Sequence, residues 1–100
     1  MKNTYELIWS DEALTGLKEI IDYLANKFSD KEVKKFIKKF DKQIDIIRIS
    51  PETFPLSHNS NLVRRSIVAK LTSIYYRIDG NKIKLVSIYD NRKNPDCLKI

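Results

Sequence analysis

The sequence has 100 residues, of which 42% are apolar and 32% charged, with a formal net charge of +6; this composition suits one soluble domain (1–100) with a single core. One Cys and one His exclude an internal disulfide and a His/Cys zinc cluster, so no metal or other cofactor is expected. No apolar run reaches the roughly 20 residues of a membrane span or forms a secretion signal. We therefore expect a cytoplasmic protein without a membrane partner. Its net positive charge favours polyanionic or acidic partners.

The first expected elements are a short strand and an amphipathic helix. "YELIWS" is short, apolar and aromatic, with Tyr5, Leu7 and Trp9 alternating against Glu6 and Ile8, and it predicts the strand. Ser10 is then placed to cap a helix whose first turn holds Asp11 and Glu12. Apolar residues follow at helical spacing and predict one buried face: Leu14, Leu17, Ile20, Ile21, Leu24 and Phe28.

A second helix is predicted almost at once. Ser29 and Glu32 have the spacing of a capping box. The expected buried stripe consists of Val33, Phe36, Ile37, Phe40, Ile44 and Ile47. Lysines occupy much of the remaining surface, and Ser50 and Pro51 end the helix. Because the connection is short, the two helices are expected to form an antiparallel αα-hairpin.

The second half of the chain predicts a loop and three strands. "PETFPLSHNSNL" has the composition of a surface loop, and "VRRSIVA", "TSIYYRI" and "KIKLVSIY" have that of strands. Asp79-Gly80-Asn81 predicts a tight hairpin between the last two strands. The resulting fold class is α+β, in the order β-α-α-β-β-β, with the helical hairpin on one face of a small, mostly antiparallel sheet.

Candidate functional side chains gather on the strands. They are Arg64, Arg65, Tyr75, Tyr76, Arg77, Tyr89, Asp90, Arg92 and Lys93. Neighbouring strand residues point to opposite faces, so only one of Arg64 and Arg65 faces away from the helices. An Arg/Tyr surface suits single-stranded RNA or a charged protein groove. The alternative is structural: the tyrosines are ordinary sheet residues, Arg77 pairs with Asp79 or Asp90, and the lysine row is a solvated face.

The order of these motifs resembles the RelE/ParE superfamily of toxins from bacterial type II toxin–antitoxin systems, with the ParE-like branch and its plasmid-stabilisation relatives the nearest. The resemblance covers nearly the whole chain. It rests on "WSDEALTGLKEIIDYL", "SPETFP", "VRRSIV" and "SIYYRIDGNKIKLVSIYDNRKNP". It implies a fold of two helices against a sheet. It also implies a cognate antitoxin that is encoded beside the gene and is acidic and disordered when free.

The resemblance also implies one of two activities: inhibition of DNA gyrase, or ribosome-dependent cleavage of mRNA. For cleavage, Arg92 matches the family's C-terminal Arg, and Arg65 or Arg64 stands for the basic residues that begin the second strand. Tyr89 occupies the place of a His in many relatives, and Thr72 that of RelE's second-strand catalytic Arg. The catalytic set is therefore Arg65, Tyr89 and Arg92, and the binding set is Arg64, Arg77, Asp90 and Lys93.

The sequence thus predicts a ParE-like toxin that acts on gyrase and is neutralised by its antitoxin. A ribosome-dependent mRNA endonuclease is the alternative, and a non-toxic basic RNA-binding domain is the third, so the sequence leaves open whether the protein is an enzyme. Exposed apolar surface that lacks the antitoxin could instead support a homodimer.

Overall fold

The computed structural model describes residues 5–57, 62–69 and 72–91. In chain order the elements are β1 (Glu6–Trp9), α1 (Asp11–Lys27), α2 (Asp30–Ile49), the 3-10 helix η1 (Pro51–Thr53), β2 (Val63–Val68), β3 (Thr72–Asp79) and β4 (Lys82–Asp90). The predicted order β-α-α-β-β-β and the α+β class are confirmed. None of the helices in the described ranges is long and apolar enough to cross a membrane.

The four strands form one sheet in the order β1-β4-β3-β2. β2, β3 and β4 are antiparallel neighbours, while β1 pairs in parallel with β4. A parallel pair needs a long crossover connection, and here the helical hairpin and the remaining strands supply it. The sheet is therefore mostly antiparallel, as predicted.

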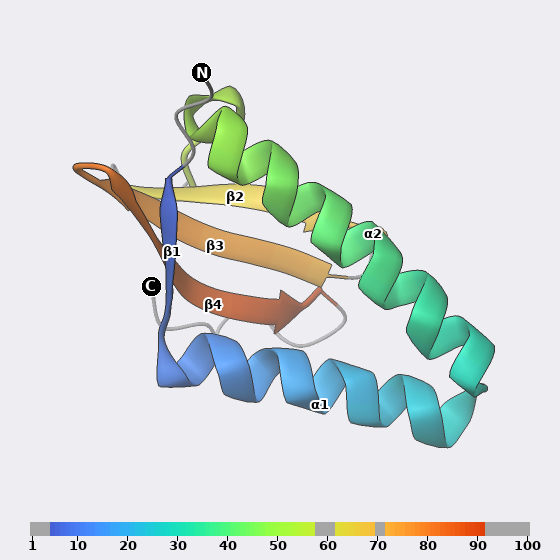
Figure 1. Cartoon of the computed structure of the whole chain (residues 1–100). Coiled ribbons are helices and arrows are strands. Elements are labelled where there is room, and N and C mark those ends of the chain that lie inside the picture. Colours follow the sequence, from blue (N-terminus) through green and yellow to red (C-terminus); the bar gives the residue numbers. More distant parts are fainter. Residues whose placement is uncertain (1–4, 58–61, 70–71, 92–100) are drawn as a thin grey trace.

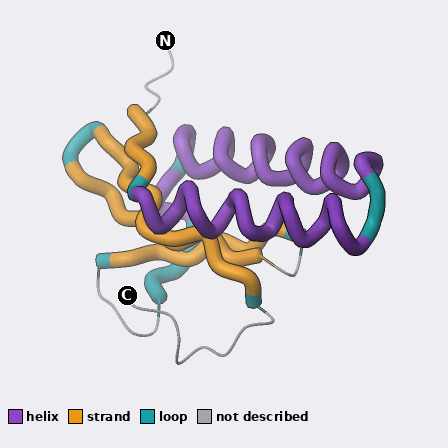
Figure 2. The backbone as a smooth tube through the Cα atoms, turned by 90° about the horizontal axis from the view of Figure 1, so that it is seen from below, coloured by secondary structure: helices purple, strands orange, loops and turns teal. Residues whose placement is uncertain are grey.

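Both helices lie on the same side of the sheet, as Figure 2 shows, and the hairpin opens from its connection at residues 28–29 (Figure 1). α1 packs along β4, whereas α2 lies toward β2. The core between the layers contains Ala13, Ile20, Phe36, Phe40, Ile44, Ile47, Val68, Ile74, Tyr76, Ile83, Leu85 and Ile88. None of the helices in the described part of the chain lies on the opposite face of the sheet, from β2 to β4, which is called here the helix-free face.

The start of α1 is fixed to the sheet by its predicted cap. The Ser10 hydroxyl oxygen accepts a hydrogen bond from the Ala13 amide (2.9 Å) and donates one to the Val86 carbonyl (2.7 Å). Ala13, one residue before the predicted Leu14, faces the sheet, and Leu14 is 51% exposed. Phe28 is also exposed, because it follows the last helical residue and no longer obeys the helical period.

The start of α2 differs from the prediction. Ser29 is the N-cap residue, but its side chain makes no capping hydrogen bond, so the expected capping box is wrong. The Glu32 amide, which a capping hydroxyl would bind, donates to the Ser29 carbonyl instead (3.0 Å), beside the ordinary helical bond from the Val33 amide to the same carbonyl (3.2 Å). The predicted stripe is largely confirmed: Phe36, Phe40, Ile44 and Ile47 are buried.

The segment after α2 is more ordered than the predicted surface loop. Pro51 is buried in η1, and its carbonyl accepts a hydrogen bond from the Tyr76 hydroxyl at 2.6 Å. Leu56 then forms an antiparallel bridge with Arg64. Backbone bonds from Ser57 to Val63 (2.7 Å) and from Arg65 to Pro55 (3.0 Å) extend this contact. Residues 55–57 therefore cover part of the outer edge of β2.

The β3–β4 hairpin has the predicted tight turn, with two residues between the strands, and one unpredicted bulge. Asp79 pairs with Lys82, and Gly80 has φ 63°, a conformation that costs Gly little. Farther along, Tyr76 pairs with Leu85 but Tyr75 pairs with Ser87, so Val86 is the extra residue. After Val86 the alternation of β4 is shifted by one residue, so Leu85 and Ile88 both reach the core.

Candidate functional site

The register of the sheet separates the predicted arginines. Arg64 lies opposite Tyr76, which is fully buried in the core beneath the helices. Arg65 lies opposite Tyr75, on the helix-free face. Because paired residues point to the same side of a sheet, Arg65 is the member of the pair that faces away from the helices.

A polar cluster on the helix-free face holds the Arg65 side chain. Its Nε donates to the Ser73 hydroxyl oxygen (3.0 Å), and its Nη2 lies 3.5 Å from Asn91 Oδ1. The Ser73 hydroxyl in turn donates to the same Asn91 oxygen at 2.5 Å. Ser73 is completely buried, so this Arg65 cluster (Arg65, Ser73 and Asn91) orients the guanidinium group, using two of its five N–H donors among the described residues.

Tyr89 lies beside this cluster. It is the register partner of Ser73 on β4, and both residues point to the helix-free face. Ser73 therefore lies between Arg65 on β2 and Tyr89 on β4. Two members of the predicted catalytic set, Arg65 and Tyr89, are brought together on one face.

Arg64 has a different environment on the helix-covered side. Its Nη1 donates to the carbonyl oxygens of Phe54 (2.7 Å) and Glu52 (3.4 Å). These bonds join η1 and the residue that follows it to β2. Burial raises the pKa of the neighbouring Tyr76 hydroxyl to about 12, and the positive charge of Arg64 partly opposes that rise.

Arg77 lies on the helix-free face, as Arg65 does. It is two residues beyond Tyr75, the β3 partner of Arg65. The structural alternative that paired it with Asp79 is wrong, because Asp79 bonds to Lys84 Nζ at 3.2 Å. Arg77 lies opposite Lys84 in the register, and its side chain makes no ion pair within the described part of the chain. It adds a positive charge to that face beside Arg65 and Lys84, and of these Lys84 is paired with Asp79.

The other predicted residues are divided between the opposite side and the undescribed segments. Asp90 follows the bulge and lies opposite Thr72, on the side of the helices. Arg92 and Lys93 lie outside the described residues. The structure thus groups Arg65, Arg77 and Tyr89, and separates them from Arg64 and Asp90.

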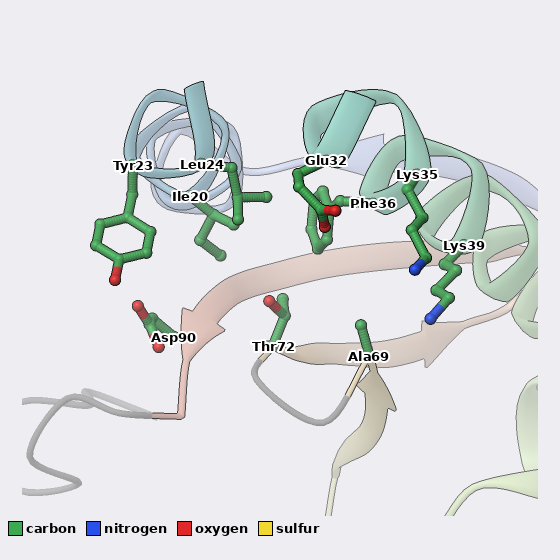
Figure 3. Close-up of a pocket in the computed structure, with 10 residues that line it drawn as sticks. All are labelled: Ile20, Tyr23, Leu24, Glu32, Lys35, Phe36, Lys39, Ala69, Thr72 and Asp90. Carbon is green, nitrogen blue, oxygen red and sulfur yellow. The ribbon is translucent and has the colours of Figure 1, made fainter. Parts of the chain in front are cut away.

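A cavity that the sequence did not predict lies between the helical hairpin and the end of the sheet (Figure 3). This hairpin cavity has a volume of about 220 Å³. It is lined by Ile20, Tyr23, Leu24, Glu32, Lys35, Phe36, Lys39, Ala69, Thr72 and Asp90. Its signal in the sequence is that Lys35 and Lys39 flank Phe36 on the border of the apolar stripe, rather than in the middle of the lysine face.

The ends of the hairpin cavity have opposite charge. In Figure 3 the Tyr23 ring points toward Asp90 at one end, whereas the Lys35 and Lys39 side chains point toward Ala69 and Thr72. Ala69 has φ 52°, an unfavourable conformation for a residue with a Cβ. Among the described residues, no group of His, Cys, Asp and Glu is arranged to hold a metal ion.

Comparison with known proteins gives a family and a fold. A family model described as "ParE toxin of type II toxin-antitoxin system, parDE" matches residues 7–95. Among solved structures, the chromosomal ParDE TA system from P. aeruginosa matches with a TM-score of 0.73 and 16% identity, over 89% of this chain and 98% of the other. At this identity the structural match supports the fold alone. No curated protein sequence matches significantly.

Proposed function

The chain belongs to the ParE toxin family of type II toxin–antitoxin systems, and from this membership we propose that it inhibits DNA gyrase by binding to it. We further propose that a cognate antitoxin neutralises this activity. The proposed target implies that the protein acts in the cytoplasm.

The orientation of Thr72 is the observation that favours binding over RNA cleavage. The family resemblance gives this position to the second-strand catalytic Arg of RelE, a cation that would stabilise charge at the scissile phosphate. Thr72 is neutral, 2% exposed, and lines the hairpin cavity on the helix-covered side. A phosphate on the helix-free face would therefore meet Arg65 but no cation from this position.

The helix-free face has the properties of a contact surface for an anionic partner. Arg65 is held in one orientation by Ser73 and Asn91, which lowers the entropy lost when a partner binds. Arg77 adds charge on the same face. A fixed guanidinium favours bidentate pairing with carboxylate or phosphate groups, either of which a topoisomerase–DNA complex offers.

Ribosome-dependent mRNA cleavage is the second candidate, and one observation favours it. Arg65 and Tyr89 lie on the same face with Ser73 between them. A cation and a phenol in this arrangement could stabilise a phosphate and transfer a proton, although an ordinary Tyr, with a pKa near 10, is a weak base or acid at neutral pH.

Two assays with the same purified protein separate the candidates. In a gyrase supercoiling assay, we expect inhibition that increases with protein concentration. In a reconstituted translation reaction mapped by primer extension, we expect intact mRNA from the wild type and from Arg92→Ala. Ribosome-dependent cuts that vanish in Arg92→Ala would overturn the gyrase proposal in favour of cleavage.

Expression in cells tests the toxin assignment itself. We expect growth arrest that is relieved when the neighbouring gene product is co-expressed. Unimpaired growth at a verified level of folded protein would instead favour the third reading, a non-toxic basic RNA-binding domain.

A further inference from the structure

The two helices of the hairpin carry net charges of opposite sign. α1 has four acidic and two basic residues and therefore a net charge of −2. α2 has four acidic and seven basic residues and therefore a net charge of +3. Six of its seven basic residues are lysines between positions 31 and 42, so the positive charge of the hairpin is concentrated in one part of α2.

Four of these lysines form a row on the side of α2 that faces away from the sheet. The row, called here the α2 ridge, consists of Lys31, Lys34, Lys38 and Lys42. Intervals of three and four residues keep side chains on one side of a helix, and the buried side chains of Phe36, Phe40 and Ile44 occupy the opposite side. All four lysines are exposed. The end of the hairpin where α2 begins extends beyond the ends of the strands (Figures 1 and 2), so a large partner can approach the ridge.

The acidic residues of α2 border the ridge without neutralising it. Glu32 lines the hairpin cavity, on another side of the helix (Figure 3). Helical spacing places Asp30 and Asp41 along one border of the ridge, and Asp45 at its C-terminal end. None of the four ridge lysines makes an ion pair with a residue in the described part of the chain. The ridge is therefore a continuous strip of positive charge.

Such a row of like charges lowers the stability of the helix that carries it. Lys38 lies four residues from both Lys34 and Lys42, a spacing at which like charges repel each other. Lys31 and Lys34 also lie toward the N-terminal end of α2, where the helix dipole disfavours positive charge. Neutral or acidic residues at these positions would suit folding better, which favours a role of the ridge in binding.

The composition of the ridge favours a double-helical nucleic acid as the ligand. It contains no apolar or aromatic side chain, since the exposed apolar residues of α2, Ile37, Ile46 and Ile49, lie beside it or beyond its C-terminal end. Protein partners and membrane surfaces are bound through such side chains, and single-stranded nucleic acids stack on aromatic rings. A row of cations alone suits the regularly spaced phosphates of a double helix.

The ridge is long enough to contact several phosphates. Lys31 and Lys42 are eleven residues apart, so at about 1.5 Å per residue the ridge is about 16 Å long. About five phosphates of one DNA strand occupy this length of the duplex axis. The side chains of α2 that could read bases are engaged elsewhere, because Gln43 donates to the Ser66 hydroxyl and Arg48 to a backbone carbonyl before β1. Binding through the ridge is therefore expected to be independent of sequence.

We propose that the α2 ridge binds duplex DNA through its phosphates, without sequence preference. The ridge lies along the phosphates that border the major groove, which in B-form DNA is about 12 Å wide and admits an α-helix. The major groove of double-stranded RNA is deep and narrow, so DNA is the preferred ligand. This inference goes beyond the proposed function, because the DNA lies on α2 rather than on the helix-free face and is bound in the absence of gyrase.

The salt dependence of DNA binding tests the proposal. A short fluorescein-labelled DNA duplex of mixed sequence is titrated with the full chain, and Kd is measured by fluorescence anisotropy over a range of salt concentrations. With four phosphate contacts, log Kd should rise with log salt at a slope of about 3.6, since each contact contributes about 0.9. Absence of binding at low salt, or a Kd that does not change with salt, would overturn the inference.

Two matched double variants locate the site. Lys34→Glu/Lys38→Glu reverses the middle of the ridge, whereas Lys35→Glu/Lys39→Glu makes the same change at the same spacing on the same helix, at residues that point to the hairpin cavity (Figure 3). At low salt we expect Kd to rise at least tenfold for the first pair and less than threefold for the second. The salt slope should fall by about 1.8 for the first pair alone. Equal weakening by the two pairs would indicate general charge attraction and overturn the inference.

Thermal unfolding of each variant separates lost binding from misfolding. If Lys34→Glu/Lys38→Glu does not fold, Lys34→Gln/Lys38→Gln provides the test, because it removes both positive charges without adding acidic residues beside Asp41 and Asp45. This variant should fold and should show the same fall in salt slope. An unchanged slope in the folded glutamine variant would show that DNA does not contact the ridge.

Competition experiments test the class of ligand. Unlabelled DNA duplex should displace the labelled duplex more effectively than double-stranded RNA or polyglutamate of equal charge. Equal displacement by the RNA would overturn the preference for DNA, and equal displacement by polyglutamate would overturn the assignment to nucleic acid. The proposed function is tested separately in the supercoiling assay, so DNA binding without gyrase inhibition would support the inference while the proposed target fails.

Discussion

Gly16 of α1 lies directly against the carbonyl oxygen of Ile88 on β4, so closely that a Cβ atom on Gly16 would overlap that oxygen. Gly in a helix interior costs roughly 0.5–1 kcal/mol relative to Ala, so its presence here has a packing reason. Without a side chain at this position, α1 can approach the part of β4 beyond its pairing with β1. The position of the helical hairpin over the sheet therefore depends on this contact.

Gly16→Ala is expected to lower the free energy of unfolding by about 1–3 kcal/mol. The better helix propensity of Ala opposes the change, but the clash with a backbone atom cannot be relieved by a side-chain rotation. Chemical denaturation measures the loss. The control is Thr15→Ala, at the exposed neighbouring residue, which should be neutral or stabilising by a few tenths of a kcal/mol. Equal stability of Gly16→Ala and the wild type would show that α1 does not approach β4 this closely.

Tyr76→Phe is expected to lower the free energy of unfolding by about 1–2 kcal/mol at neutral pH. The variant loses the buried hydrogen bond from the Tyr76 hydroxyl to the Pro51 carbonyl (2.6 Å) and leaves that carbonyl without this donor. Tyr75→Phe is the matched control on the adjacent residue, which points to the other face. Urea denaturation of both variants at pH 8 makes the comparison. A loss as large in Tyr75→Phe would contradict a specific role of the Tyr76 bond.

The same residue predicts a pH dependence. Burial raises the pKa of Tyr76 from 10.0 to about 12 in the folded protein. Between these values the unfolded chain releases the proton while the folded chain retains it, so the contribution to stability is full below pH 10 and is lost as the pH rises toward 12. We expect the stability difference between wild type and Tyr76→Phe to shrink above pH 10. Parallel stability curves from pH 8 to 11.5 would contradict this.

Ala69, at the rim of the hairpin cavity, is expected to respond to its backbone conformation more than to its contacts. It is exposed and has φ 52°. Ala69→Gly should raise the free energy of unfolding by between zero and about 1 kcal/mol, because relief of backbone strain in the folded state exceeds the added entropy of the unfolded chain. Ala69→Val should cost about 1–2 kcal/mol, since a branched Cβ is more restricted. A higher unfolding temperature for Ala69→Val than for Ala69→Gly would contradict the left-handed conformation of Ala69.

The sequence predicts the elements of this fold well because their signals are local. The Ser10 cap, the stripe of α2 and the turn at Gly80 each depend on a few neighbouring residues, and all three are present in the structure. The capping box at Ser29 fails although its residues have the right spacing. The Glu32 amide, which a capping hydroxyl would bind, donates to the Ser29 carbonyl.

The faces of the last strand could not be predicted, because the bulge at Val86 has no local signal such as a glycine. Without the extra residue, strict alternation from Leu85 would place Tyr89 beneath the helices and Asp90 on the helix-free face. The bulge exchanges them. The Val86 carbonyl is held by the Ser10 hydroxyl, 76 residues earlier in the chain, so a tertiary contact accompanies the bulge. The hairpin cavity likewise requires three strands and two helices to be placed before it can be recognised.

Arg64 and Arg65 provide the sharpest test of which face of the sheet carries activity. They are neighbours with the same charge, but Arg64 bonds to the carbonyls of Glu52 and Phe54, whereas Arg65 lies on the helix-free face with Ser73 and Asn91. Arg64→Ala should therefore lower the free energy of unfolding by about 1–3 kcal/mol, while the remaining folded protein keeps its inhibitory potency. Arg65→Ala should lower potency at least tenfold, about 1.4 kcal/mol of binding free energy.

Gyrase supercoiling and thermal unfolding, measured on the same preparations, separate the two effects. Arg65→Lys keeps the charge but cannot reproduce both the Ser73 bond and a bidentate contact, so we expect intermediate potency. Ser73→Ala should reduce potency less than Arg65→Ala, because it loosens the guanidinium without removing it. If Arg64→Ala were the inactive variant and Arg65→Ala retained full potency, the helix-free face would not be the contact surface, and the target would have to bind on the side of the helices.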